Sequence, residues 1–432
     1  MAREMKDSGI EWIGEIPKEW DIKVAFQLFN QVKNKNEGLV EQNLLSLSYG
    51  KIKRRSIDAV GGLLPESFDG YNIIEADDIV LRLTDLQNDH TSLRVGLATE
   101  RGIVTSAYLT LRNQSKNTPS YLYYYLHSFD LCKGFYGMGA GVRQGLNWDG
   151  LKLLKIILPS IEEQTEITTY LDNKCTEIDS VIEKTKSTIE EYKKLKQSVI
   201  TEAVTKGIRP NREMKDSGIE WIGEIPKEWD ILPFRHILFE RNEKNNPVIS
   251  EERLSLSIEL GVTLYADKTT NLDRFKEDFT QYKLAHEGDL VMNSMNMIVG
   301  ATGVSKWFGC VSPVYYTFYD NDIEHTTAKF CEYIFRSKTM LRVLHSYGKG
   351  IYAIDRGDDK INTCRLKVSK EDLKSIKIPL PNISEQKEIV AYLNDKTAEI
   401  DTLIAKKEQI VSELESYKKS LIYEYVTGKK VV

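Results

Sequence analysis

Apolar side chains recur every three or four residues in two long segments of the chain, with lysine and glutamate between them. The segments lie at 159–206 and 381–432. This period is typical of an amphipathic α-helix that buries one stripe of its surface against a partner. The apolar positions are Ile167, Leu171, Ile178, Ile182, Ile189, Tyr192, Leu195 and Val199, and in the second segment Ile389, Leu393, Ile400, Ile404, Val411, Leu414, Tyr417 and Leu421.

Both predicted helices have recognisable ends. Ser160 and Asn382 suit the N-cap position, each with a glutamate three residues later, and Gly207 and Gly428 suit the C-terminal stop. The first helix, at 162–205, would be about 66 Å long at about 1.5 Å per residue. One such stripe could be ordinary core packing. Two matched stripes, one closing each half, favour two long antiparallel helices that hold two globular domains apart.

The stripes match because the chain is duplicated. The twenty residues REMKDSGIEWIGEIPKEWDI occur identically at 3–22 and 212–231, and residues 158–182 align without gaps to 380–404. We call the two identical stretches the openings. The two openings are 209 residues apart, whereas the starts of the two helices are 222 residues apart. The region between opening and helix is therefore 13 residues longer in the second half. A fixed repeat of this size predicts one architecture built twice.

The variable region between each opening and its helix has a mixed pattern. The aromatic stretches YLYYYLHS (121–128) and FCEYIFRS (330–337) predict short helices. We therefore expect an α/β fold class, with two similar mixed α/β domains, two long antiparallel, coiled-coil-like helices and a pseudo-twofold internal repeat. Runs rich in apolar and β-branched residues predict strands at 44–52, 78–83, 288–293 and 312–319.

These patterns divide the chain into five parts. Pro210, just past the first helix, marks the joint between the halves. The predicted parts are a first mixed domain at 1–158 that includes the opening 3–22, a first spacer helix at 159–206, a linker at 207–211, a second mixed domain at 212–380 that includes the opening 212–231, and a second spacer helix with a tail at 381–432.

The composition, 41% hydrophobic and 28% charged, is that of an ordinary globular protein. No apolar run approaches the roughly 18 residues of a membrane span, and MAREMKDSGIEW lacks the basic-then-apolar pattern of a signal peptide. The five cysteines are scattered and form no CxxC pair. We therefore expect a cytoplasmic protein with reduced thiols, and neither a disulfide framework nor a zinc ribbon.

The net charge of −5 is unevenly distributed. Each opening holds three basic and six acidic residues, whereas the variable regions hold 16 basic and 13 acidic residues (23–158) and 21 basic and 20 acidic residues (232–380). DNA binding requires a local basic face rather than a basic chain. The overall sign therefore does not exclude a nucleic-acid partner.

Three segments of the variable regions are candidates for DNA contact. Residues 51–55 form the densest basic cluster, which could equally be a solvated surface loop. The loops after two matched glycine pairs, at 139–141 and 348–350, carry arginine and amide side chains that can bond to guanine and adenine edges. A tight turn would explain the glycines but not these side chains. The candidates are Lys51, Lys53, Arg54, Arg55, Arg143, Gln144, Asn147, Lys349, Tyr352, Arg356, Lys360 and Asn362.

Catalytic signatures are weak or missing. GMGAGVRQG is not followed by GK[ST], so it is a poor nucleotide loop. The nearest approach to the Asn-Pro-Pro-aromatic tetrapeptide of adenine methyltransferases is Asn246-Pro247-Val248, which lacks the rest, and the six histidines show no metal-ligand spacing. The sequence therefore argues against catalysis by this polypeptide and against a metal site.

Several motifs agree with one family in order, spacing and duplication. They are SGIEWIGEIPKEWD in each opening, the helix starts LPSIEEQTEI and LPNISEQKEI, the aromatic helix, and the strand start Gly288-Asp289-Leu290-Val291, present in the first copy as Asp77-Asp78-Ile79-Val80. Asp77 stands where the family usually has glycine. Over essentially its whole length the chain resembles the specificity (S) subunit of type I restriction-modification enzymes.

The resemblance implies a non-catalytic subunit whose two target-recognition domains each read one half of a split sequence in double-stranded DNA, with the paired helices fixing the gap. Two methyltransferase (M) subunits would bind it and use S-adenosylmethionine, and restriction (R) subunits would add ATP- and Mg-dependent cleavage. This chain would bind no cofactor itself. The openings and helix starts would then be the duplicated docking surface, although a recent duplication also explains their identity. The docking candidates are Trp12, Glu15, Trp20, Glu163, Gln164, Trp221, Glu224, Trp229, Glu385 and Gln386.

Two rival interpretations remain open at this point. A stand-alone nuclease or methyltransferase would turn over DNA with a metal ion or S-adenosylmethionine. A coiled-coil structural adaptor that binds only proteins would show no DNA affinity at low salt. The sequence does not reveal the bases read, the length of the gap, or which domain reads which half-site.

Overall fold

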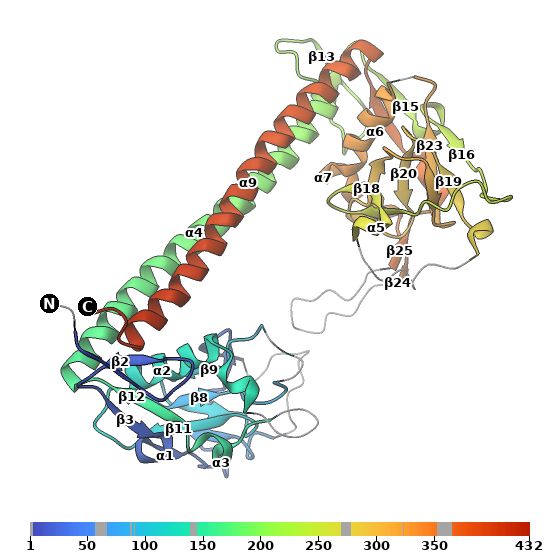
Figure 1. The fold of residues 1–432 in the computed structure, drawn as a ribbon. Helices are drawn as coiled ribbons and strands as arrows, with labels where there is room; N and C mark the ends of the chain where they lie inside the picture. The colour runs from blue at the N-terminus through green and yellow to red at the C-terminus, as the bar shows by residue number, and fades with distance from the viewer. Residues whose placement is uncertain are drawn as a thin grey trace. The chain divides into compact units, whose positions relative to one another are not determined.

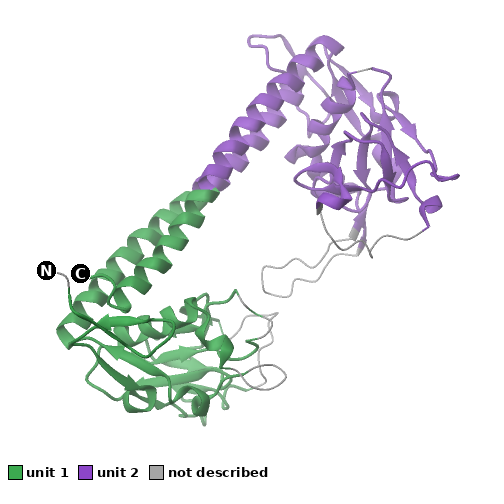
Figure 2. Cartoon of the chain, viewed as in Figure 1, with its two compact units in different colours: residues 1–186, 408–432 green, residues 187–407 purple. Residues whose placement is uncertain are grey.

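The computed structural model describes residues 3–56, 67–86, 89, 91–138, 145–268, 278–322, 324–351 and 365–432. It forms two compact units, unit 1 with residues 1–186 and 408–432 and unit 2 with residues 187–407 (Figure 2). Each unit therefore combines one mixed domain with a part of both long helices. Among the described residues, no helix is both long and apolar enough to cross a membrane.

The two long helices are α4 (Ile161–Lys206, 46 residues) and α9 (Ile383–Val426, 44 residues) (Figure 1). Both predicted N-caps are confirmed, because the Glu163 amide donates to Ser160 Oγ (3.2 Å) and the Glu385 amide to Asn382 Oδ1 (3.0 Å). The helices end at the predicted places, just before the two glycines. The glutamate carboxylates of the predicted capping boxes instead bind arginines of the openings.

The helices run antiparallel inside each unit. In unit 1, Asp179 pairs with Lys418 (2.6 Å) and Lys186 with Glu415 (3.4 Å). In unit 2, Lys196 pairs with Asp401 (2.7 Å). Most of the predicted apolar stripe is buried or partly buried, and two members are exposed: Leu195 is 48% and Tyr417 54% exposed.

The mixed domain of unit 1 is built on a four-stranded antiparallel sheet in the order β4–β11–β8–β9. Its strands are β4 (Phe29–Gln31), β11 (Leu109–Asn113), β8 (Ile79–Leu81) and β9 (Val95–Leu97). The aromatic helix α2 (Pro119–Leu131) contacts β9 and buries Tyr121, Leu122 and Tyr125 in the core.

Smaller antiparallel pairs and short helices surround this sheet. The pairs are β1 (Met5–Asp7) with β2 (Glu15–Pro17), β3 (Asp21–Val24) with β12 (Lys155–Leu158), β5 (Leu45–Ser48) with β6 (Lys51–Arg54), and β7 (Asn72–Ile74) with β10 (Gly102–Val104). The short helices are α1 (Ala25–Leu28), η1 (Gly134–Gly137) and α3 (Trp148–Leu151).

Unit 2 repeats this topology. Its sheet has the order β16–β23–β20–β21, made of β16 (Phe239–Arg241), β23 (Tyr315–Tyr319), β20 (Leu290–Asn293) and β21 (Thr302–Val304). The pairs around it are β13 (Met214–Asp216) with β14 (Glu224–Pro226), β15 (Asp230–Pro233) with β26 (Lys377–Leu380), β17 (Leu254–Ser257) with β18 (Gly261–Leu264), β19 (Lys283–Ala285) with β22 (Gly309–Val311), and β24 (Lys349–Ile351) with β25 (Arg365–Lys367).

The remaining helices of unit 2 include α6, the counterpart of α2 at the 209-residue offset, and α7, which corresponds to the end of α2 and to η1. They are η2 (Phe234–His236), α5 (Tyr265–Lys268), η3 (Phe279–Gln281), η4 (Met297–Val299), α6 (Thr326–Arg336), α7 (Lys338–Tyr347) and α8 (Lys370–Ser375). The predicted fold class is confirmed: two similar mixed α/β domains accompany two long antiparallel helices.

One predicted strand differs in the structure. The run 44–52 is a hairpin of β5 and β6 rather than a single strand. Tyr49 and Gly50 both have positive φ, 49° and 75°, which is the conformation of a two-residue hairpin turn. An alternating apolar pattern continues through so short a turn, so the pattern alone did not reveal the reversal.

A buried acid comes directly before strand β8 in unit 1 and strand β20 in unit 2, the inner strands that we call the central strand of each sheet. Asp78 is 1% exposed and accepts two 2.7 Å bonds from Arg112 on β11. Asp289, equally buried, accepts a 2.6 Å bond from Arg241 on β16. The residue before each acid has positive φ, which explains why glycine is usual where Asp77 stands (φ 69°).

Candidate nucleic-acid interface

Each opening is fastened to the start of a long helix by an arginine–glutamate pair. Arg3 donates to both Oε atoms of Glu163 (2.6 and 2.9 Å), and Trp20 Nε1 donates to the same carboxylate (3.0 Å). In unit 2, Arg212 binds Glu385 in the same way. The bonds to Glu163 and Glu385 raise the pKa of Arg3 and Arg212 above their usual values. Both guanidinium groups therefore remain charged.

The glutamine next to each glutamate closes the same junction. Gln164 Nε2 donates to the Pro159 carbonyl (3.0 Å) and Gln386 Nε2 to the Pro381 carbonyl (2.8 Å). Gln164 also accepts from the Thr118 amide at 2.9 Å, which fixes the start of α2. The matched Glu-Gln pairs therefore hold the opening and the mixed domain on the helix.

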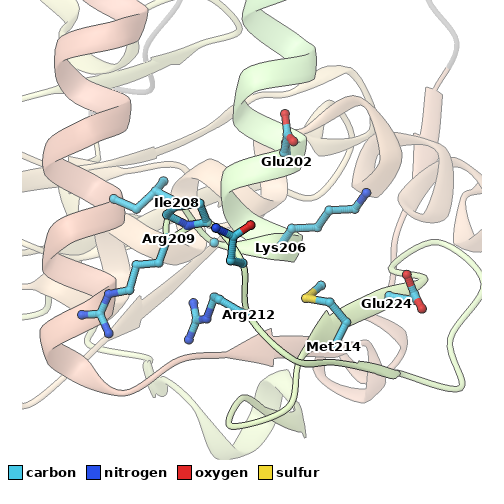
Figure 3. Close-up of a pocket in the computed structure, with 10 residues that line it drawn as sticks. Glu202, Lys206, Ile208, Arg209, Arg212, Met214 and Glu224 are labelled. Atoms are coloured by element: carbon cyan, nitrogen blue, oxygen red, sulfur yellow. The ribbon is translucent and has the colours of Figure 1, made fainter.

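Each opening also contacts the end of the other long helix. A Cβ added at Gly428, after α9, would lie 2.5 Å from Pro17 Cδ, and one added at Gly207, after α4, 2.8 Å from Arg212 Nη1. The chain around Gly207 lines an open hollow of about 370 Å³, and Figure 3 shows the side chains of Lys206 and Met214 among those that line it. Each opening is thus held between the start of one helix and the end of the other.

This arrangement separates the ten predicted docking residues into three groups. Trp12, Glu163 and Trp221 are partly buried, and Glu15 and Glu224 are exposed. The buried residues can act on a partner only through the surface that they support. A direct docking role remains a prediction for the exposed ones. The residues buried inside their own unit are Trp20, Gln164, Trp229, Glu385 and Gln386.

The basic cluster 51–55 lies on β6 and just after it. Lys51 pairs with Asp179 on α4 (3.2 Å), and Arg54 binds Glu100 through Nε (2.8 Å). Within the described part of the chain, Lys53 and Arg55 are exposed and have no ion pair. Two of the four cations therefore remain available to a phosphate without breaking an existing contact.

The structure describes only two of the predicted residues near the glycine pairs. Asn147 is the N-cap of α3, where its Oδ1 accepts from the Gly150 amide (3.1 Å). Lys349 is exposed on β24, with its Nζ 3.3 Å from an Asp372 oxygen. Asn147 therefore has a local structural role that the sequence did not indicate. Arg143, Gln144, Tyr352, Arg356, Lys360 and Asn362 lie outside the described residues.

The segments that follow the glycine pairs join the sheets in equivalent ways. The Leu146 amide donates to the Leu83 carbonyl (2.9 Å) and the Val368 amide to the Ser294 carbonyl (3.0 Å). Both acceptors follow the central strand of their sheet. Each glycine-pair loop is therefore anchored beside the loop that leaves the central strand.

In unit 1, a buried arginine holds the loop that leaves the central strand, described at residues 82–86 and 89; we call it the arginine-shaped loop. Arg94 is fully buried, and its guanidinium donates to the carbonyls of Arg82 (3.0 Å), Thr84 (2.9 Å) and Asp89 and to Tyr136 Oη (3.1 Å). Because these carbonyls come from one loop, Arg94 fixes Arg82, Thr84 and Asp89 relative to one another. Sequence reasoning missed this residue, since an arginine before a strand carries no pattern that distinguishes it from a surface side chain.

The hairpin turn of β5 and β6 reaches the same place. A Cβ added at Gly50 would lie 3.2 Å from the Leu93 Cβ, next to the arginine-shaped loop. Tyr49 in this turn is 80% exposed. Its counterpart in unit 2 is the turn after β17, where Leu260 is 75% exposed. In unit 1 the hairpin turn therefore packs beside Leu93, and the matching turns of the two units expose different side chains.

This duplicated arrangement corresponds to known proteins. A model of the type I restriction modification DNA specificity domain matches residues 73–191 and 240–412. The MjaX type I restriction enzyme specificity subunit of Methanocaldococcus jannaschii is 24% identical, over 96% of this chain and 95% of its own length. The MjaVIII specificity subunit of the same organism is 22% identical, over 96% and 93%.

A solved structure has the same fold. It was determined in work on complex assembly and conformational transition of the type I R-M system, and it matches with a TM-score of 0.64 at 13% identity, over 96% of this chain and 99% of that chain.

Proposed function

Because the chain belongs to the type I restriction modification DNA specificity family, we propose that each of its mixed domains reads one half of a bipartite site in double-stranded DNA. The chain is a DNA sequence-specificity subunit without a catalytic role of its own. The proposed half-site readers are the two target-recognition domains at 1–158 and 212–380. The gap between the half-sites would be set by α4 and α9.

One observation carries this proposal: the framework is duplicated, whereas the exposed loops on it are not. The anchors of the glycine-pair loops are equivalent in both units, but the turns beside them expose Tyr49 in one unit and Leu260 in the other. Two readers of the same sequence would need the same side chains. Equivalent frameworks with different side chains fit two readers of different short sequences.

The partners follow from the same family. A type I specificity subunit acts on DNA together with a methyltransferase. We propose in addition that two methyltransferase subunits bind, one on each opening, and that they supply S-adenosylmethionine for adenine N6 methylation. Restriction subunits, where the system has them, would supply ATP- and Mg-dependent cleavage. A coiled-coil adaptor that binds only proteins is not favoured, because the family match extends into both mixed domains.

The test is a methylation map. The chain is co-expressed with its methyltransferase in a host free of methylation, and the DNA is sequenced by a method that detects N6-methyladenine. We expect two short half-sites separated by a fixed unspecified gap. A complex that assembles and methylates at a single continuous site, or that methylates nowhere, would contradict the bipartite proposal.

Exchanging residues 232–380 for the corresponding region of another specificity subunit tests which part reads what. We expect one half-site to change, while the other half-site and the gap stay the same, because α4 and α9 are left intact. The same methylation map measures the outcome. A change in both half-sites would show that the two domains do not read independently.

A further inference from the structure

The identical openings have different surroundings at one position. In unit 1, three aromatic rings surround the Trp12 ring: Tyr125, Phe129 and Tyr423, with centroids at 5.6, 5.4 and 6.2 Å. Tyr423 Oη also donates to the Trp12 carbonyl (3.1 Å). The end of α9 and the aromatic helix α2 therefore close over this tryptophan.

The matching tryptophan of unit 2, Trp221, has lost these rings. The 209-residue repeat places Ile334 and Lys338 at the positions of Tyr125 and Phe129, and the 222-residue repeat places Thr201 at that of Tyr423. Thr201, Lys338 and Trp221 line a groove of about 910 Å³ in unit 2. The groove is thus open where unit 1 carries its own side chains.

The groove is predominantly cationic. Lys194 and Lys206 on α4 and Lys338 and Arg342 on α7 are exposed along it, and none of the four has an ion pair within the described residues. Of its two acids, Glu190 is neutralised by Lys193 (2.9 Å), which leaves Glu202. Apolar surface from Trp221 and Ile222 completes the lining.

The groove continues at the end of α4. Glu202 and Lys206 line it and also the hollow beside Gly207 (Figure 3). That hollow extends to Glu224 of the opening. The open surface of unit 2 therefore runs from Arg342 on α7, past Trp221 of the opening, to Glu224 of the same opening.

We propose that this groove binds an acidic segment of a partner protein, with one apolar side chain packed on Trp221, and that it does so once per chain. Charge complementarity argues for an anionic occupant. The volume lies within the range of sites for small ligands, about 300–1,000 Å³, which suits a single peptide segment. A DNA duplex is a poor occupant, because it presents its phosphates on a broad convex surface.

The proposal goes beyond bipartite DNA reading and does not depend on it. Two equivalent openings would otherwise offer every partner two equal sites. Because aromatic rings cover Trp12 but not Trp221, a partner that uses this groove binds unit 2 alone. The chain would thus bind one copy of this partner, while partners that bind the openings would bind twice.

The test uses the full chain without its methyltransferase, which we place on the openings, and three fluorescein-labelled ten-residue peptides. Each peptide has a central leucine among glycines alternating with glutamate, glutamine or lysine. We expect the glutamate peptide to bind at least tenfold more tightly than the glutamine peptide, with one peptide per chain. Equal binding of these two peptides, or two glutamate peptides per chain, would overturn the proposal.

Two variants localise the site. Thr201→Tyr with Lys338→Phe fills the groove with the residues of unit 1, and Lys338→Glu with Arg342→Glu reverses its charge. Each should lower glutamate-peptide affinity at least tenfold, and the second should gain affinity for the lysine peptide. Lys406→Glu, an exposed change on α9 outside the groove, is the matched control and should stay within twofold of the original chain.

Three further measurements separate the possible failures. Circular dichroism and the unfolding midpoint confirm that each variant is folded, and the methylation map should keep both half-sites. Unchanged peptide binding in the filled variant would overturn the proposal. So would a charge-reversed variant that loses affinity for a nonspecific 20-base-pair duplex while peptide binding persists, because the groove would then serve DNA.

Discussion

At the scale of single residues, the buried polar groups behind the loops of unit 1 are the most informative. Asp130 on α2 is 1% exposed, and its Oδ2 accepts a 2.6 Å bond from the Arg94 amide. Burial raises the pKa of its carboxyl to about 6. Asp130 supports the arginine-shaped loop, but its ionised form is unfavourable in the folded protein.

This pKa makes the stability of unit 1 depend on pH. A raised folded-state pKa contributes stability that is fully present below the unfolded value, near 4, and is lost as pH rises through about 6. Asp130→Asn imitates the protonated acid. We expect it to raise the free energy of unfolding at pH 8 by about 2 kcal/mol and to leave it nearly unchanged at pH 4.

Thermal unfolding of the full chain and the variant at both pH values measures this. Burial lowers the pKa of the neighbouring His127 to about 4, so its own contribution is lost as pH falls from above 6.5 towards 4, the opposite direction. Both proteins share that term, and it cancels in their difference. A variant that is less stable at pH 8 than at pH 4, relative to the original chain, would contradict the role given to Asp130.

The ion pair at the central strand of unit 1 gives a second prediction. Arg112→Leu leaves Asp78 buried without its guanidinium partner. Breaking a fully buried pair costs about 3–5 kcal/mol, and because Arg112 is half-exposed we expect about 2 kcal/mol. Arg101→Leu, which breaks the exposed pairs with Glu41 and Glu75, should cost less than about 1 kcal/mol. Urea unfolding of both variants compares the two losses.

Residue roles were predictable where they follow from local rules and not where they need the tertiary structure. Ser160 and Asn382 cap their helices as predicted. Asn147 also caps a short helix, a role that the sequence did not indicate because so short a helix has no apolar period to detect; its base contact stays a prediction. Arg94 could not be predicted at all, since its acceptors are carbonyls and a tyrosine brought together only by folding.

At the scale of elements, the long helices depend on one buried stripe. Ile182 on α4 is 6% exposed and packs in the core of unit 1 together with Val411 of α9. The position before it, Val181, is 48% exposed. Both residues are β-branched and lie in the same helix, so replacing either one with alanine changes helix propensity to a similar extent. Only the change at Ile182 also removes a buried contact between the helices.

Ile182→Ala should lower the free energy of unfolding by about 2–4 kcal/mol, because it removes buried methyl groups and leaves a cavity. Val181→Ala is the matched control and should change it by less than about 0.5 kcal/mol. Urea unfolding followed by circular dichroism at a helical wavelength gives both values. Equal effects of the two substitutions would show that the α4–α9 contact does not stabilise unit 1.

The elements also show where sequence patterns are strong. Both long helices begin and end within a residue or two of the predicted places, because a cap, a period and a glycine stop agree. The hairpin 45–54 was missed, because a two-residue turn interrupts an alternating pattern too briefly to be seen. Helix α7 was missed too, although Ser337, the last residue of the predicted helix 330–337, caps it.

At the scale of the whole molecule, the duplication was evident from the sequence, whereas its most specific exception was not. The difference between Trp12 and Trp221 arises from three substitutions in segments far apart in the chain. Each substitution by itself is ordinary divergence between the two repeats. Only the fold shows that they meet at one tryptophan.

The exposed acids of the openings carry a prediction for assembly. Glu15→Lys together with Glu224→Lys should weaken binding of the methyltransferase about tenfold, or about 1.4 kcal/mol, because these positions are exposed and equivalent. Glu37→Lys with Glu251→Lys makes the same charge change on exposed positions of the mixed domains. Analytical ultracentrifugation without DNA compares the two. Unchanged assembly in the first variant would exclude that face from docking.

The division of each unit between distant parts of the chain also affects how the protein is made. Unit 1 needs residues 408–432: Tyr121 Oη donates to the Val426 carbonyl (3.2 Å), and Tyr423 covers Trp12. After residue 186, a ribosome must add 222 more residues before it reaches residue 408, where the part of α9 that belongs to unit 1 begins. At about 5–20 residues per second, this takes roughly 10–45 s. The half that is translated first is therefore the half that closes last.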